Sequence, residues 1–363
     1  MANTSEKTLL VGNGINRVFC DSDYSWGDLL KDLSKLGSFD SGNIDLSNPF
    51  KPLPLAFEEI LRAKQNYYKE SVQVLKRRAA EIFEKLPVRK AHKMIVMSAK
   101  YRNVLTTNYE YTLEKAYAEI RYPDKNYEDL CKNKISTNEE IHSLMRRYEF
   151  TDECLAVWHI HGEINHTKYL NAEKILPSNS ILIGYNQYVS YLDTIYRYFF
   201  TEKKTKYTEY TSLQEKMTTC LADPSRLNIE TWIDFFFFRD IDIIGLTLDF
   251  SEMHLWWILN RRFSLIKDSD IFSEETDKKA SFTPTNTITY YYPKLSKNCL
   301  EEKCSDALND VKQKAILNML DVLGVITKAV KCKSYEDFYT QVLGHNALAS
   351  INKGWKKWSQ SLI

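Results

Sequence analysis

The stretch that decides the fold is Thr8 to Asn16, which reads TLLVGNGIN. Its first half, Thr8 to Val11, is a short β-branched and apolar run of the kind that forms a buried strand, and the turn of Gly12 and Gly14 follows at once. Nucleotide-binding sheets usually begin this way, because a glycine turn brings bare backbone N–H groups against phosphates. Arg17 stands where a third glycine of the dinucleotide-binding pattern would be. Taken alone, the stretch is therefore also compatible with a tight turn that merely needs glycine.

Composition excludes several classes of protein. The 363 residues are 44% hydrophobic and 27% charged, which is ordinary for a soluble globular chain. The net charge of +1 gives no bulk attraction to nucleic acid or to an anionic membrane, and no apolar run reaches the roughly 18 residues that span a bilayer. The start has no signal-peptide pattern, and the seven cysteines show no zinc-ribbon spacing. We expect a cytoplasmic protein with reduced thiols, no membrane contact and no direct contact with nucleic acid.

Aromatic clusters are a second possible sign of nucleic-acid binding. Tyr290 to Tyr292 and Phe235 to Phe238 lack the interleaved arginine and lysine that base-stacking surfaces carry. We expect these clusters to pack in the core or at a subunit interface.

Short apolar runs alternate with helical patterns along the chain. This alternation predicts an α/β fold: a Rossmann-like, mostly parallel sheet flanked by helices. The expected strands are Thr8–Val11, Asn103–Thr106, Ala156–Ile160, Ser180–Ile183, Ile241–Ile244, Thr287–Tyr292 and Val325–Ala329. The expected helical runs are Ala56–Leu86, Tyr109–Ile120, Met253–Phe263, Lys312–Leu323 with Ile316, Met319, Leu320 and Leu323 on its buried face, and a helix opened by Ser334 with Tyr335, Phe338, Tyr339 and Val342 on its buried face.

The domain organisation follows from the same pattern. We expect one domain over residues 1–363, with a helical insertion or small helical subdomain at about 40–100 and a polar insertion at about 200–227. Three stretches, Ser38–Pro54, Lys203–Arg226 and Lys267–Asn286, are polar or weakly periodic and are expected to be loop-like.

Parallel sheets bind ligands at the carboxyl ends of their strands, so the residues that follow each strand matter most. Asn108 and Glu110 follow the second strand, and they are either site residues or a helix cap and a first-turn carboxylate. His159 and His161 alternate along the third strand, as a two-histidine metal site would, but no third ligand is evident. We therefore expect no metal, and His161 is either a general base or a satisfied core histidine. Gly245 opens a second glycine turn.

The four strand ends, in this order, resemble the sirtuin family. They read Gly-Asn-Gly-Ile-Asn, Thr-Thr-Asn-Tyr-Glu, His-Ile-His-Gly and Gly-Leu-Thr-Leu. Sirtuins carry a Gly-Ala-Gly-Ile-Ser loop, a Thr-Gln-Asn-Ile-Asp segment, a catalytic histidine before glycine, and a Gly-Thr-Ser turn. The set is most similar to the SIR2-like NADases of bacterial anti-phage defence. The resemblance spans about residues 7 to 343. The chain departs from sirtuin deacetylases in lacking a four-cysteine zinc module, and it has Glu110 where the family often has aspartate.

The resemblance implies NAD⁺ as the substrate and no zinc. By similarity, Asn108 binds the ribose hydroxyls and places a water molecule, and His161 is the general base. The resemblance assigns the remaining contacts to the loops: Gly12, Asn13, Gly14 and Asn16 to the pyrophosphate and the nicotinamide ribose, Glu110 to the nicotinamide amide, and Gly245 and Thr247 to the adenosine side.

The implied activity is cleavage of the nicotinamide–ribose bond by an NAD⁺ glycohydrolase that depletes NAD⁺ during abortive infection. Such an enzyme must be silent until triggered, and little chain lies outside the similar region. We therefore expect a homo-oligomer, a separate regulatory partner such as a HerA-like ATPase, or both. Two alternatives are a catalytically silent NAD- or ADP-ribose-binding scaffold and an NAD-dependent protein deacylase, the latter disfavoured by the absent zinc module.

Overall fold

The computed structural model describes residues 7–19, 24–35, 51–63, 68–98, 100–134, 144–150, 155–164, 181–200, 211–272, 282–295 and 306–344. The strands are β1 Lys7–Val11, β2 Tyr101–Thr106, β3 Cys131–Lys134, β4 Arg147–Phe150, β5 Ala156–His159, β6 Ile241–Ile244, β7 Ile288–Leu295 and β8 Ile326–Cys332. The helices are α1 Trp26–Ser34, α2 Leu53–Ala63, α3 Tyr68–Glu84, α4 Lys90–Met97, α5 Thr112–Arg121, α6 Tyr127–Leu130, α8 Tyr185–Phe200, α9 Leu213–Ala222, α10 Asp234–Phe238, α11 Met253–Phe272 and α12 Asp306–Val322, with 3-10 turns η1 Asn13–Asn16 and η5 Pro224–Arg226. Residues 335–344 form a further helix.

The described strands form one sheet in the order β3-β4-β5-β2-β1-β6-β7-β8. The run from β5 to β8 is parallel throughout, and β3 and β4 add an antiparallel edge. Numbered in chain order, the parallel strands stand as 3-2-1-4-5-6, which is the Rossmann order. The order reverses between β1 and β6, so the crevice beyond their carboxyl ends is the topological switch point. The predicted α/β class is therefore confirmed.

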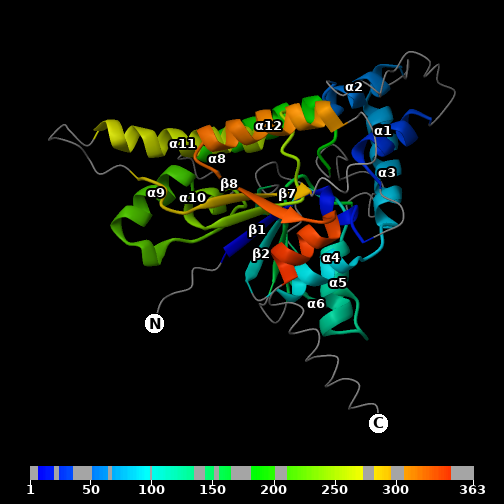
Figure 1. The fold of residues 1–363 in the computed structure, drawn as a ribbon, viewed down its shortest axis with the longest axis horizontal. Helices are drawn as coiled ribbons and strands as arrows, with labels where there is room; N and C mark the ends of the chain where they lie inside the picture. Colours follow the sequence, from blue (N-terminus) through cyan, green and yellow to red (C-terminus); the bar gives the residue numbers. More distant parts are fainter. Residues whose placement is uncertain are drawn as a thin grey trace, which may run out of the picture.

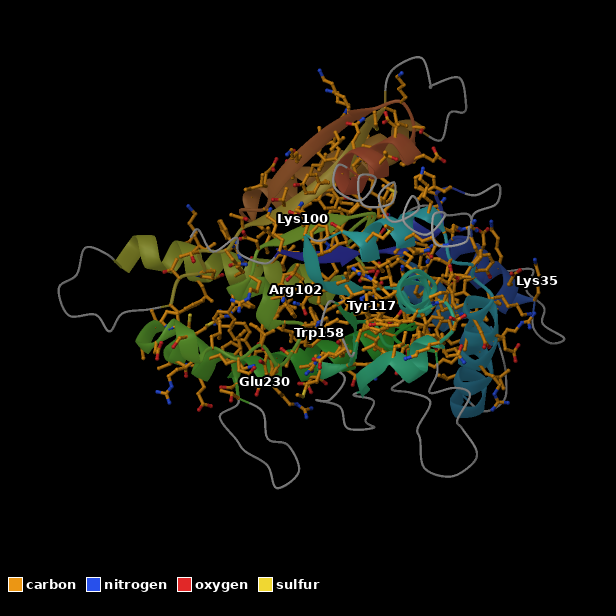
Figure 2. All side chains as sticks on the ribbon, turned by 90° about the horizontal axis from the view of Figure 1, so that it is seen from below. Lys35, Lys100, Arg102, Tyr117, Trp158 and Glu230 are labelled. Carbon is orange, nitrogen blue, oxygen red and sulfur yellow. The ribbon has the colours of Figure 1, made fainter. Side chains whose placement is uncertain are left out.

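Alternation along β1 assigns its side chains to opposite faces of the sheet. Leu10 packs in a core with α8, α10, α11 and α12, whereas Leu9 and Val11 pack in a second core with α4, α5 and helix 335–344. In Figure 1, α8, α11 and α12 run together along one side of the sheet, and α4, α5 and α6 lie on the other. Figure 2 shows Trp158 and Tyr117, one from each core, within the packed interior, while Lys35 lies at the periphery.

A third apolar core belongs to α1, α2 and α3. Leu29, Phe57 and Leu75 are fully buried there, and the cluster closes against Tyr109 beyond the end of β2. Figure 1 shows these three helices grouped at one end of the sheet. Helices α1 to α3 therefore share a core of their own, whereas α4 packs on the sheet. The bounds of 40–100 and 200–227 remain predictions.

Several local predictions were wrong. Within 180–183, Ile181 makes only an isolated antiparallel bridge to Gly162, and residue 180 lies outside the described residues. The run over 56–86 contains two helices, α2 and α3, with residues 64–67 outside the description. Met319 and Tyr335 are exposed, because each sits at the edge of its helix's apolar stripe. Helices α9 and α11 also occupy parts of the stretches 203–226 and 267–286, whose residues 203–210 and 273–281 lie outside the described ranges.

Candidate functional site

The two glycine turns meet at the switch point. The Gly14 N–H donates to the Gly245 carbonyl oxygen over 2.9 Å. A Cβ on Gly14 would lie 2.5 Å from Tyr339 Oη and 2.7 Å from that same carbonyl oxygen, and Gly245 has a φ of +66°. Both positions therefore require glycine. The resulting floor of the crevice is bare backbone, which lets a ligand approach the main chain closely.

A cavity of about 820 Å³ opens above this floor. Its volume falls in the range of small-molecule and cofactor sites. The cavity brings together seven of the nine residues expected in the site: Asn13, Gly14, Asn108, Glu110, His161, Gly245 and Thr247. Gly12 and Asn16 are not part of its lining. Four separate strand ends thus contribute to one concave surface.

Asn16 lies behind the cavity wall and joins two residues that do line it. Its Nδ2 donates to Glu110 Oε1 over 2.7 Å and to Asn13 Oδ1 over 3.0 Å, and its Oδ1 lies 2.9 Å from His92 Nε2. Burial raises the pKa of Glu110, although the hydrogen bond from Asn16 opposes that rise. In this arrangement Asn16 positions Asn13 and Glu110 at the cavity.

Asn108 is fixed by its backbone and its side chain. Its N–H donates to Thr106 Oγ1 over 3.0 Å, and its Nδ2 donates to the Gly12 carbonyl oxygen over 3.3 Å. The buried Asn108 side chain therefore bridges the end of β2 to the glycine turn after β1. An amide held in this way presents both a donor and an acceptor at a defined place.

His159 supports Asn108 and does not share a site with His161. Its Nε2 lies 2.7 Å from Glu114 Oε1, and its Nδ1 lies 3.2 Å from the Asn108 carbonyl oxygen. Burial alone would lower the pKa of His159, but the Glu114 carboxylate raises it above its ordinary value. The predicted alternation of His159 and His161 onto one strand face is wrong, because β5 ends at His159 and the chain turns at Gly162, where φ is +89°.

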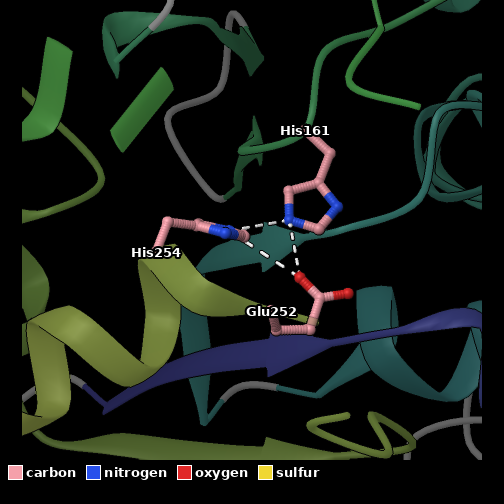
Figure 3. A group of neighbouring side chains, drawn as sticks. All are labelled: His161, Glu252 and His254. Atoms are coloured by element: carbon pink, nitrogen blue, oxygen red, sulfur yellow. Dashed lines mark hydrogen bonds and ion pairs between the residues drawn. The ribbon is translucent and has the colours of Figure 1, made fainter. Parts of the chain in front are cut away.

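His161 instead meets two residues that the sequence reasoning did not assign to the site. Its Nε2 lies 2.8 Å from His254 Nε2 and 3.3 Å from Glu252 Oε2, and the last two atoms are 3.9 Å apart. Figure 3 shows the three side chains converging, with His254 on the first turn of α11 and Glu252 just before it. The available signal was their position after β6, the strand that borders the switch point.

The surroundings of this trio are aromatic and closed on one side. His254 is fully buried, and the rings of Tyr188, Tyr191 and Trp232 pack against it. Burial, together with the neighbouring His161, lowers the pKa of His254 well below its ordinary value, so its imidazole is neutral. Glu252 and His161 both line the cavity, which leaves the trio open on that side.

The cavity is also lined by the turn after β6 and by tyrosines. Thr247 is exposed there, and Tyr290 Oη donates to the Leu246 carbonyl oxygen over 2.9 Å. Asp249 pairs with Lys312 from α12. The cavity is therefore lined by His161, by the turn after β6 and by several tyrosines.

Comparison of the sequence with protein-family models and with curated proteins finds no match. The described helices include none with the length and apolar character needed to cross a bilayer.

Proposed function

We propose that this protein is an NAD⁺ glycohydrolase that cleaves the nicotinamide–ribose bond. One observation carries the proposal: a cavity at the switch point of a Rossmann-ordered sheet gathers Asn108, His161 and the two glycine turns. A dinucleotide suits this cavity in size, and the bare backbone at Gly14 and Gly245 suits its pyrophosphate. The resemblance of the four strand ends to sirtuin-related NADases supports the same assignment.

The proposed chemistry divides between Asn108 and His161. The nicotinamide–ribose bond breaks through an oxocarbenium-like state, and nicotinamide is a ready leaving group because its nitrogen is already cationic in NAD⁺. Asn108 would hold the ribose hydroxyls and a water molecule, since its amide is fixed against the Gly12 carbonyl oxygen. His161 would take the proton from that water. With Nε2 of His161 facing His254 and Glu252, Nδ1 is the nitrogen left to accept it.

Glu110 would orient the amide of nicotinamide. Glu110 lines the cavity, and its carboxyl group is held by Asn16. Thr247 and Gly245 would contact the adenosine side. These roles predict that the nicotinamide half lies toward Asn108 and the adenosine half toward the tyrosines.

The test is incubation of the protein with NAD⁺ alone and with NAD⁺ plus an acyl-lysine peptide, with chromatographic measurement of nicotinamide and ADP-ribose. We expect both products from NAD⁺ alone. Release that requires the peptide would identify a deacylase, and binding without release would identify a scaffold; either result contradicts the proposal.

We also propose that the NADase acts as the toxic effector of an anti-phage system in the cytoplasm. A constitutive NADase would kill its host, so a homo-oligomer or a HerA-like ATPase partner would hold it silent until infection. Size-exclusion chromatography with light scattering, with and without the co-expressed partner, tests this. A monomer whose NADase rate does not respond to the partner would contradict it.

A further inference from the structure

The cluster of His161, Glu252 and His254 has the shape of a metal site. All three facing atoms, two imidazole Nε2 and one carboxylate Oε2, lie within 4.8 Å of one another. Their separations of 2.8, 3.3 and 3.9 Å form a triangle. The circle through its corners has a radius of about 2.0 Å, so an ion displaced by about 0.7 Å from the plane of the three atoms lies about 2.1 Å from each of them, which is zinc–ligand distance.

The donor set selects the class of ion. Two imidazoles and one carboxylate suit Zn²⁺, Co²⁺ and related transition ions, whereas Ca²⁺ and Mg²⁺ take oxygen ligands. Catalytic zinc sites hold three protein ligands of this kind and leave a fourth position open. Here the open side faces the cavity, because His161 and Glu252 both line it while His254 is buried behind them. Glu252 Oε2 is buried and accepts no hydrogen bond from the described residues. A buried carboxylate oxygen in this state is available to coordinate a cation.

We propose that His161, Glu252 and His254 bind one divalent transition-metal ion of the zinc class, and that the bound ion silences the proposed NADase. The silencing rests on the proposed function. An imidazole that coordinates a metal through Nε2 keeps its proton on Nδ1, so His161 loses the lone pair with which it would accept a proton from water. The ion would also occupy the end of the cavity where the ribose must lie.

The site is tested first without NAD⁺. Protein freed of metal by dialysis against a chelator is titrated with Co²⁺, whose visible absorption intensifies in tetrahedral coordination, and Zn²⁺ affinity is measured by competition with a chromophoric chelator. We expect one ion per chain and a tetrahedral Co²⁺ spectrum that Zn²⁺ displaces. His254→Gln and Glu252→Gln should each weaken Zn²⁺ binding at least tenfold.

Two control variants test whether Zn²⁺ binds to carboxylates or thiols elsewhere in the protein. Glu59→Gln changes a half-exposed carboxylate paired with Lys51, and Cys220→Ser removes a partly buried free thiol. Both should bind Zn²⁺ as the unsubstituted protein does. Glu252 is 18% exposed, so Glu252→Gln should fold even if His254→Gln does not. Circular dichroism establishes folding for each variant.

Absence of a stoichiometric ion, or Zn²⁺ affinity unchanged in folded Glu252→Gln, would overturn the site. The silencing is read as the ratio of nicotinamide release with and without one equivalent of Zn²⁺. We expect at least a tenfold decrease, reversed by chelator, with the ratio near one in Glu252→Gln. Activity that Zn²⁺ does not change would overturn the silencing alone. Metal binding in a protein that never releases nicotinamide would keep the site and refute both the proposed function and the silencing.

Discussion

The two ends of the same sheet carry buried polar clusters of opposite character. At the amino end, the fully buried Asp242 of β6 pairs with Lys7 over 3.2 Å and with Lys100, and it accepts a hydrogen bond from Tyr101 Oη over 2.7 Å. Its carboxylate is fully matched by partners. At the carboxyl end, Glu252 Oε2 and His254 Nδ1 are buried without a hydrogen bond from the described residues, beside a large cavity.

On our proposal, this contrast separates residues that hold the fold together from residues that bind a ligand. Buried polar groups are normally satisfied, since an unmatched one costs about 1–3 kcal/mol. The Asp242 cluster follows that rule with charges that join β1, β2 and β6. The carboxyl end departs from it at the switch point, where the topology places ligands. Substitutions at the two ends should therefore affect different quantities.

The largest effect is expected at Asn108. Asn108→Ala removes the amide that bridges the glycine turn, and we expect nicotinamide release to fall by at least about 100-fold, as when one preorganised catalytic group is deleted. His161→Ala should act similarly through loss of the base. Thermal unfolding should change little. The matched control is Asn228→Ala, an exposed asparagine far along the chain. Near-normal turnover in both Asn108→Ala and His161→Ala would refute the proposed mechanism.

The amino end should show the reverse behaviour. Asp242→Ala leaves the Tyr101 hydroxyl and the lysines without their shared acceptor, so we expect the free energy of unfolding to fall by about 2 kcal/mol. Urea unfolding measures this, with the exposed Asp321→Ala as control. The nicotinamide-release rate of the folded variant should stay within about twofold of normal. Loss of nicotinamide release by Asp242→Ala without loss of stability would contradict the division between a structural amino end and a ligand-binding carboxyl end.

A pH-dependent effect links the site to acid stability. Burial, with the nearby Arg89, lowers the pKa of His92 to about 3. The unfolded chain binds a proton near pH 6.5 and the folded chain does not until about pH 3, so stability contributed by neutral His92 is lost as pH falls between these values. We expect a slope of about 1.4 kcal/mol per pH unit, measured by urea unfolding at several pH values. The slope should flatten in His92→Gln. An equal slope in that variant would show that groups other than His92 cause the pH dependence of stability.

The smallest effect is expected on the surface of α3. Arg78 and Glu81 form an exposed ion pair over 2.9 Å. Glu81→Gln should change the free energy of unfolding by less than about 0.5 kcal/mol and leave nicotinamide release unchanged. A larger decrease in the free energy of unfolding would contradict the expectation that exposed ion pairs contribute little to the stability of this protein.

The central strands could be predicted from the sequence because they are buried on both faces. Ile241–Ile244 was predicted at its observed bounds, and the glycine turn after β1 marked the switch point in advance. The antiparallel strands β3 and β4 escaped prediction, because CKNK is polar and RYEF alternates polar and aromatic residues over only four positions, so that neither contains an apolar run. Short strands of this kind form only where a neighbouring strand pairs with them.

Only those residues of the candidate site that stand directly after predicted strands could be predicted from the sequence. Glycines and an asparagine after strands are visible in the sequence, whereas Glu252 and His254 resemble ordinary first-turn residues of a helix. Their meeting with His161 depends on tertiary structure. In the sheet order, β5 and β6 are separated by β2 and β1, so the loop after β6 must reach across three strand spacings, about 14 Å. No local sequence pattern predicts a contact across that distance.

The most direct test of the switch-point cavity as a dinucleotide site is equilibrium binding of ADP-ribose, the part of NAD⁺ that remains after nicotinamide leaves. Titration calorimetry compares the unsubstituted protein with Thr247→Trp, which fills the cavity from an exposed position, and with Glu81→Gln as control. We predict one ADP-ribose per chain, bound at least tenfold more weakly by Thr247→Trp and unchanged by Glu81→Gln. No binding, or equal binding by Thr247→Trp, would contradict the account.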